Sequence, residues 1–128
     1  MPEEYTALVE ALMALTQETE PARTDAEAVT VTLPMAEDEW RTRPDTVSYG
    51  TVSLDFEADA LYGDDRKVAV AYEGAVELYS HVKSGDGWVE LIAATLTDHC
   101  DGSWSLNYHT YERETGLFHW EFVFQVEG

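Results

Sequence analysis

The sequence predicts a single α+β domain over residues 1–128, with one antiparallel β-sheet and two helices packed on one face of it. Three observations support this fold class. The chain opens with an apolar stripe at helical spacing, short segments of alternating apolar and polar residues follow, and a second stretch at helical spacing interrupts them. A chain of 128 residues has the length of one domain and can bury a core without a disulfide or a metal ion.

The first half of the chain is expected to hold one helix and two strands. Residues 3–19 carry apolar side chains at intervals of three and four, which predicts an amphipathic helix that ends before Pro21. Residues 27–33 alternate between apolar and polar, which predicts a half-buried strand. Residues 46–57 predict another strand, in which the apolar phase changes by one residue at Gly50 and so indicates a bulge or a tight turn.

A second helix is expected at about residues 64–83, where apolar residues again recur at intervals of three and four. Asp64 and Asp65 are suitable N-cap residues, and Gly85 lies just past the expected end. The run KVAVAY within this stretch also fits a strand. The length of the periodic stretch favours the helix, because strands seldom run to about 18 residues.

The last third of the chain predicts consecutive antiparallel strands with one apolar face. The first covers residues 88–97, and Asp101-Gly102 is a turn signal before a strand that begins at Trp104. The last strand, LFHWEFVFQV, alternates throughout. Its expected apolar face consists of Phe118, Trp120, Phe122, Phe124 and Val126, and its polar face of His119, Glu121 and Gln125.

The charge balance restricts the classes of partner. The chain has 26 acidic and 7 basic residues, a net charge of -19. Such a surface repels nucleic-acid phosphates and anionic membranes, and it attracts a basic protein partner at long range. Acidity that serves only solubility, or that reflects a saline cytoplasm, is the competing interpretation. Without the basic start of a signal peptide or an apolar run of about 20 residues, we expect a cytoplasmic protein.

Catalytic and cofactor motifs are missing from the sequence: it contains no P-loop, GxGxxG, GxSxG or CxxC pattern. We therefore expect no enzymatic activity, no cofactor and no metal site. In the polar cluster at residues 98–101, at most alternate members could share a metal ion, because adjacent strand residues point to opposite faces. The cluster is interpreted as a hairpin turn with exposed polar residues. His109 and His119 fall on the polar phase of neighbouring strands, where solvated histidines are favoured over a site. A nucleophile pair of Cys100 with a histidine stays open.

Trp40 differs from the other aromatic residues because it lies in a polar connection among charged neighbours. It is either an interface anchor or a lid that folds back on the core. The acidic residues near it, on the strand that follows and on the outer face of the expected second helix (Glu73 and Glu77) form either a patch for a basic ligand or a solvated face. The residues expected to bind a partner are Glu37, Asp38, Glu39, Trp40, Asp55, Glu57, Asp59, Glu73 and Glu77.

Residues 76–112, VELYSHVKSGDGWVELIAATLTDHCDGSWSLNYHTYE, carry a pattern of tryptophan, Thr-Leu, a turn with glycine, an aromatic residue and tyrosines. The positions are Trp88, Thr95, Leu96, Gly102, Trp104, Tyr108 and Tyr111. In this pattern the chain resembles the YezG-type immunity proteins (antitoxins) of bacterial polymorphic toxin systems, and its opening helix fits their layout. The resemblance implies early strands after that helix, a second helix leading into Trp88, and a strand that carries Thr95 and Leu96.

If the resemblance holds, it implies that the protein binds a cognate toxin, basic and for example a nuclease, and neutralises it by occluding its active surface. Two functions of other classes stay open. One is an acidic mimic of nucleic acid that inhibits a DNA-binding protein. The other is an enzyme or small-ligand binder, in which His109, His119 and acidic residues meet in a concave pocket.

Overall fold

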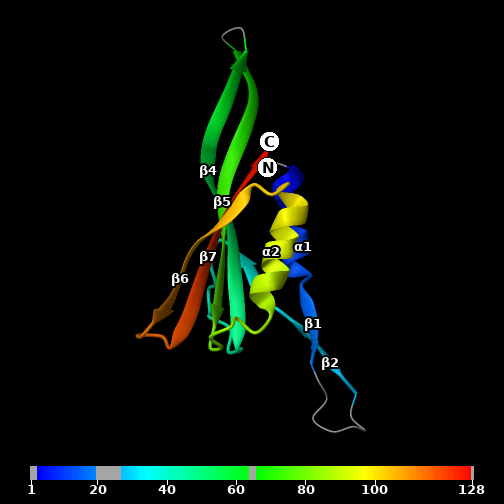
Figure 1. The fold of residues 1–128 in the computed structure, drawn as a ribbon, viewed down its shortest axis with the longest axis vertical. Helices are drawn as coiled ribbons and strands as arrows, with labels where there is room; N and C mark the ends of the chain where they lie inside the picture. Colours follow the sequence, from blue (N-terminus) through cyan, green and yellow to red (C-terminus); the bar gives the residue numbers. More distant parts are fainter. Residues whose placement is uncertain (1–2, 20–26, 64–65, 128) are drawn as a thin grey trace.

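The computed structural model describes residues 3–19, 27–63 and 66–127, and of residues 56–63 and 66–70 it describes the backbone only. Two helices and seven strands are present in this part of the chain, so the α+β class is confirmed (Figure 1). In chain order the elements are α1 (Glu3–Met13), β1 (Thr16–Thr19), β2 (Val29–Thr32), β3 (Met35–Glu37), β4 (Ser48–Gly63), β5 (Arg66–Ser80), α2 (Trp88–His99), β6 (Trp104–Glu112) and β7 (Leu117–Glu127).

The expectation of one antiparallel sheet is wrong. The strands form a two-stranded ribbon, β1-β2, and a five-stranded sheet in the order β3-β4-β5-β7-β6. The larger sheet is mixed, because β3 pairs with β4 in parallel while the other neighbours are antiparallel. The sequence did not reveal β3, since a strand of three residues is too short to show a period of two.

The first helix is shorter than expected and gives way to a strand. It ends at Met13, and residues 16–19 form β1, whose threonines suit a strand better than a helix. The strand expected at residues 27–33 is present as β2, but all four of its residues are exposed because it pairs only with β1. The ribbon therefore projects from the body of the molecule (Figure 1).

The helix expected at residues 64–83 is wrong, because residues 66–80 form β5. Positions such as Tyr72 and Val76 satisfy both a helical period and a period of two, so the periodicity was ambiguous. The strand is longer than expected because the β4-β5 hairpin extends beyond the neighbouring strands. β7 pairs with β5 only from residue 71 to residue 80 (Figure 1). The N-cap candidates Asp64 and Asp65 lie outside the described residues.

At Gly74, residues of the neighbouring strands approach the backbone of β5 closely. A Cβ at this position would lie 2.3 Å from the carbonyl oxygen of Ser53 and 2.5 Å from the ring of Phe124. A glycine inside a strand is typical of such close contact. In the expected helix the same residue would only have lowered the propensity by about 1 kcal/mol.

The strand expected at residues 88–97 is also wrong, because this segment is helix α2. Its buried residues, Trp88, Ile92 and Leu96, follow one another at intervals of four and form a helical stripe. The turn expected at Asp101-Gly102 is present. Both residues have positive φ, and Ser103 donates its N–H to the carbonyl of Cys100, but the turn joins α2 to β6 instead of two strands.

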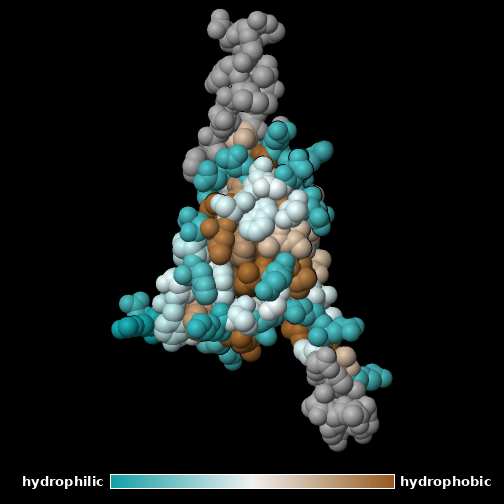
Figure 2. All heavy atoms as spheres, in the orientation of Figure 1, coloured by the Kyte–Doolittle hydropathy of each residue, from teal (hydrophilic) through white to brown (hydrophobic). Residues whose placement is uncertain are grey.

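Both helices pack on one face of the five-stranded sheet, and the core lies between these two layers (Figure 1). The expected alternation along β7 is confirmed, since its even-numbered residues from Trp120 to Val126 are buried against the helices. In the view of Figure 2, hydrophobic residues lie in the middle of the molecule with hydrophilic residues around them. The main core residues are Tyr5, Leu8, Leu12, Val52, Val76, Leu78, Trp88, Ile92, Leu96, Phe122 and Phe124.

In the part of the chain that the structure describes, neither α1 nor α2 is long and apolar enough to cross a membrane.

Candidate functional site

The sheet face that points away from the helices, called the outer face below, carries a row of stacked rings. Strand register places Tyr49 of β4, Tyr79 of β5 and His119 of β7 side by side. The Tyr49 and Tyr79 ring centroids lie 5.1 Å apart, and those of Tyr79 and His119 lie 4.2 Å apart, with nearly parallel planes. Cross-strand aromatic pairs of this kind fix side-chain orientation and stabilise the sheet locally.

The next row along the sheet carries a like-charge pair. Glu77 of β5 lies directly opposite Glu121 of β7, and Tyr108 of β6 lies opposite Glu121. Like charges directly opposite each other destabilise a sheet. Asn107 donates a hydrogen bond to Glu121 at 3.1 Å. A positive charge near Glu77 would offset the repulsion between the two carboxylates.

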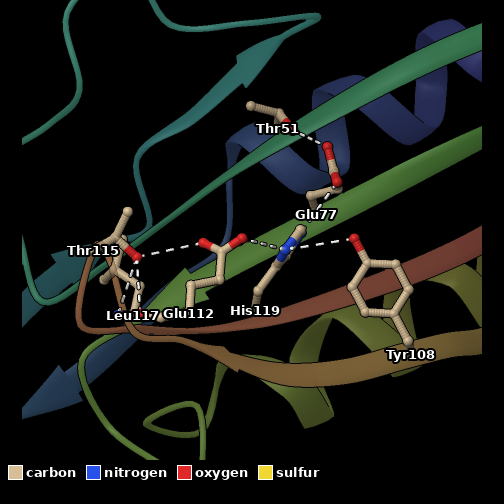
Figure 3. A network of polar contacts seen from close by, with 7 residues as sticks. All are labelled: Thr51, Glu77, Tyr108, Glu112, Thr115, Leu117 and His119. Atoms are coloured by element: carbon tan, nitrogen blue, oxygen red, sulfur yellow. Dashed lines mark hydrogen bonds and ion pairs between the residues drawn. The ribbon is translucent and has the colours of Figure 1, made fainter.

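His119 supplies that charge from the neighbouring row (Figure 3). Its Nε2 lies 3.1 Å from Oε1 of Glu77, and its Nδ1 lies 3.5 Å from both Oε2 of Glu112 and the hydroxyl of Tyr108. Thr115 donates its hydroxyl to Glu112 at 3.4 Å. His119 is only 5% exposed, so its two ring nitrogens contact these partners and little water.

The electrostatics of this cluster favour the charged pair. Burial alone would lower the pKa of His119, but the hydrogen bond and the charge of Glu77, followed by those of Glu112, outweigh it and raise the pKa. The hydrogen bond from His119 lowers the pKa of Glu77, against the opposing effect of burial. Imidazolium and carboxylate therefore stabilise each other's charged forms, and both ring N–H groups donate when the imidazole is protonated.

A groove of about 570 Å³ lies beside this cluster on the outer face. One wall is the segment after β3, which turns at Asp38, where φ is 69° and the backbone N–H bonds to the carbonyl of Val52. Trp40 then donates its indole N–H to the carbonyl of Gly50 at 2.9 Å, which fixes its half-buried ring. The groove is lined by Asp38, Glu39, Trp40, Arg43, Tyr49, Thr51, Glu77, Tyr79, Glu112 and Thr115.

The structure brings together four of the residues expected to bind a partner and separates the others. Asp38, Glu39, Trp40 and Glu77 line the groove. The rest lie elsewhere: Glu37 beside α1, Asp55 exposed on β4, Glu73 near Trp104, and Glu57 and Asp59 on β4 with side chains outside the described residues.

Sequence reasoning missed Tyr49, Tyr79 and Glu112 as members of one site, and it named His119 only for an alternative pocket shared with His109. The residues on β4, β5 and β7 could have been found from their common polar phase once those strands were paired. Glu112 could not, because it reaches His119 from the end of β6, and β6 has a register shift between Leu106 and Tyr108.

The expectation of two solvated histidines on one face is wrong for His119, which is buried. The register shift in β6 pairs His109 with Trp120, so His109 lies on the helix side and stacks on the Trp120 ring at 4.4 Å. His119 meets Glu77 and Glu112, as a pocket site would require, but His109 does not join them. The imidazole is too enclosed to reach a substrate in the groove directly.

Two other kinds of reactive site were considered from the sequence, a cysteine nucleophile and a metal centre. Cys100 is buried, and burial followed by the charge of Glu4 raises its thiol pKa to about 11, so it is not a reactive thiolate near neutral pH. Among the described residues, no group of three or more His, Cys, Asp or Glu side chains could hold a metal ion.

A second cavity of about 570 Å³ lies between the β1-β2 ribbon and the end of the sheet. Val31, Leu33, Pro34, Val47 and Trp88 give it a largely apolar lining, so it differs in character from the acidic groove on the outer face.

No protein-family model matches the chain, and no curated protein matches it. The resemblance to YezG-type immunity proteins thus stays a hypothesis from the sequence pattern. Part of the layout that it implies is present, namely the opening helix, the early strands and the strand with Trp104, Tyr108 and Tyr111. Another part is not: no helix leads into Trp88, and Thr95 and Leu96 lie on helix α2.

Proposed function

We propose that this protein is an immunity-type binding protein that captures a basic partner, a cognate toxin, in the groove on its outer face and neutralises it by occlusion. The groove carries this proposal: it combines acidic and aromatic side chains from the sheet, which a packed core holds in place, and from the segment after β3. The immunity role comes from the sequence resemblance, and the groove supplies the binding chemistry.

Charge around the groove suits a basic partner. Asp38, Glu39, Glu77 and Glu112 line it, and Arg43 is the one basic side chain among its described lining residues. The whole chain has a net charge of -19, which extends the same attraction over a longer range. Such a field accelerates encounter with a basic protein and makes the association sensitive to salt.

Aromatic side chains in the groove suit the short-range part of binding. Trp40, Tyr49 and Tyr79 are residue types that dominate the binding energy of protein interfaces. Their orientations are fixed before binding by the indole hydrogen bond and by ring stacking. A preformed site loses little side-chain entropy when the partner arrives, and occlusion requires no turnover.

The test is a binding and neutralisation assay with the basic protein encoded next to this gene in its genome. We expect a complex that weakens by about tenfold or more between low and high salt, together with relief of the partner's toxicity. Asp38→Asn combined with Glu39→Gln should weaken the complex. The matched control is Glu90→Gln combined with Asp98→Asn, which removes two charges from exposed positions on α2.

Two results would contradict the proposal. One is the absence of a complex at either salt concentration. The other is an equal loss of affinity in the groove pair and the α2 pair, because net charge alone would then account for the binding.

A further inference from the structure

The hydroxyl of Tyr49 gives the groove a polar group that no described residue of the protein uses. Tyr49 is 5% exposed, yet its hydroxyl forms no hydrogen bond with any residue that the structure describes. Among the described residues the one fully buried side-chain polar atom without a partner is the Tyr5 hydroxyl, so the unbonded Tyr49 hydroxyl keeps contact with the solvent in the groove. A polar group that lacks a partner and lies at the wall of a cavity is suited to bond with whatever fills that cavity.

The surroundings of this hydroxyl show that it faces the groove. After burial, the charges that act on the pKa of Tyr49 are those of Arg43 and Glu112, and both residues line the groove. Its ring is held by stacking on Tyr79 at 5.1 Å, so the hydroxyl cannot turn away without breaking the stack. The hydroxyl is therefore a fixed group with free hydrogen-bonding capacity.

The carboxylates beside it also have capacity to spare. The side chain of Glu112 is 36% exposed, and its contacts with His119 and Thr115 are long, at 3.5 Å and 3.4 Å. The side chain of Glu77 is 32% exposed and accepts one short contact, from His119. A carboxylate offers about four lone-pair sites, so each can accept further N–H groups from the groove side.

Resting on the proposed function, we propose that the groove binds a guanidinium group, which is the side chain of an arginine on the partner. Its N–H groups donate to Glu112 and to the Tyr49 hydroxyl, and its plane lies against the aromatic lining that Trp40 and Tyr79 provide.

An arginine fits this lining better than a lysine. A guanidinium is flat, stacks on aromatic rings and carries five donors that can reach several acceptors at once. The acceptors here come from β4, β5 and the end of β6, so they surround a planar group better than a point charge. Arg43, exposed at the rim, would repel the incoming cation and so limit the affinity.

The test uses the whole protein and three small probes: N-acetylarginine amide, N-acetyllysine amide and the neutral isostere N-acetylcitrulline amide. Each is titrated while NMR records the indole N–H of Trp40 and the backbone amides of the groove. We expect saturable shifts with the arginine probe, binding weaker by about tenfold with the lysine probe, and no saturation with citrulline.

Three variants test the proposal through the direction in which each changes the affinity for the arginine probe. Tyr49→Phe keeps the ring and removes the hydroxyl, and it should weaken the arginine probe by about tenfold. Arg43→Gln should tighten binding of the same probe because it removes a like charge. The matched control is Tyr111→Phe, which removes a hydroxyl from an exposed position on β6 and should leave the affinity unchanged.

The inference is overturned if citrulline or lysine binds as well as arginine, or if Tyr49→Phe has no more effect than Tyr111→Phe. Its failure can be told apart from that of the proposed function. A salt-sensitive partner complex that depends on Asp38 and Glu39, without arginine binding, would overturn only the guanidinium site. Arginine binding without any basic partner would support the site and overturn the immunity role.

Discussion

The two faces of the five-stranded sheet are stabilised in different ways, although the same strands supply both. On the helix side, Val76, Leu78, Phe122 and Phe124 are at most 1% exposed and belong to the hydrophobic core. On the outer face, the same strands carry Glu77, Tyr79 and His119, which hold one another through directed polar and stacking contacts.

The two faces therefore contribute differently: the helix side supplies stability, and the outer face supplies positioned polar groups. Burial of apolar area is roughly additive and non-directional, so the helix side supplies most of the stability. Hydrogen bonds and ion pairs near the surface contribute little net free energy, but they fix positions and charges. The outer face can therefore carry a like-charge pair and an unbonded hydroxyl at small cost, because the opposite face keeps the sheet folded.

The largest expected effect is on the helix side. Phe122→Ala should lower the free energy of unfolding by about 3–5 kcal/mol, since it leaves a cavity where the ring is 1% exposed and packs near Trp104. Urea unfolding followed by circular dichroism measures the loss. Phe122→Leu should recover most of the stability. A loss below about 1 kcal/mol would contradict the view that this face supplies the stability.

The alternation along β7 made the helix side predictable from the sequence. Five apolar side chains at even positions over residues 117–126 leave no other regular assignment. The assignments of β5 and α2 failed for opposite reasons. In β5, Tyr72 and Val76 fit both periods, and only tertiary pairing decides between them. In α2, the helical spacing of Trp88, Ile92 and Leu96 was present in the sequence, but the segment was predicted as the first of the consecutive strands in the last third of the chain.

The outer face was predictable only in part. A cluster of acids near Trp40 could be expected from composition, and Asp38, Glu39 and Glu77 do meet there. The position of His119 could not, because it depends on which strands are neighbours in a sheet with a non-sequential order. Strand order and a register shift are properties of the whole chain, and no local pattern encodes them.

The second effect tests the polar network through pH. His119→Gln should cost about 1–3 kcal/mol where the network is charged, because it removes the partner of two carboxylates. The raised pKa of His119 gives stability that is complete below about 6.5 and is lost as pH rises through the folded value. The lowered pKa of Glu77 gives stability that is present above about 4.5 and is lost as pH falls through its folded value.

The difference in stability between the natural protein and His119→Gln should thus be largest between about pH 4.5 and pH 6.5, and smaller on either side. Urea unfolding at several pH values measures it. His109→Gln is the matched control, since it makes the same chemical change at an exposed residue that stacks on Trp120. A difference that does not vary with pH would show that His119 acts by packing alone.

The smallest effect on stability is expected at Trp40, which belongs to the outer face but is half-buried. Trp40→Phe removes the hydrogen bond to the carbonyl of Gly50 and should cost about 1 kcal/mol in urea unfolding. Trp40→Ala should cost only slightly more, and yet it should weaken partner binding strongly, as an interface anchor would. If Trp40→Ala instead costs as much stability as Phe122→Ala, the indole is a lid on the core. The two faces would then not differ in function at the wall of the groove, because Trp40, the residue assigned to binding, would stabilise the fold as strongly as a core residue does.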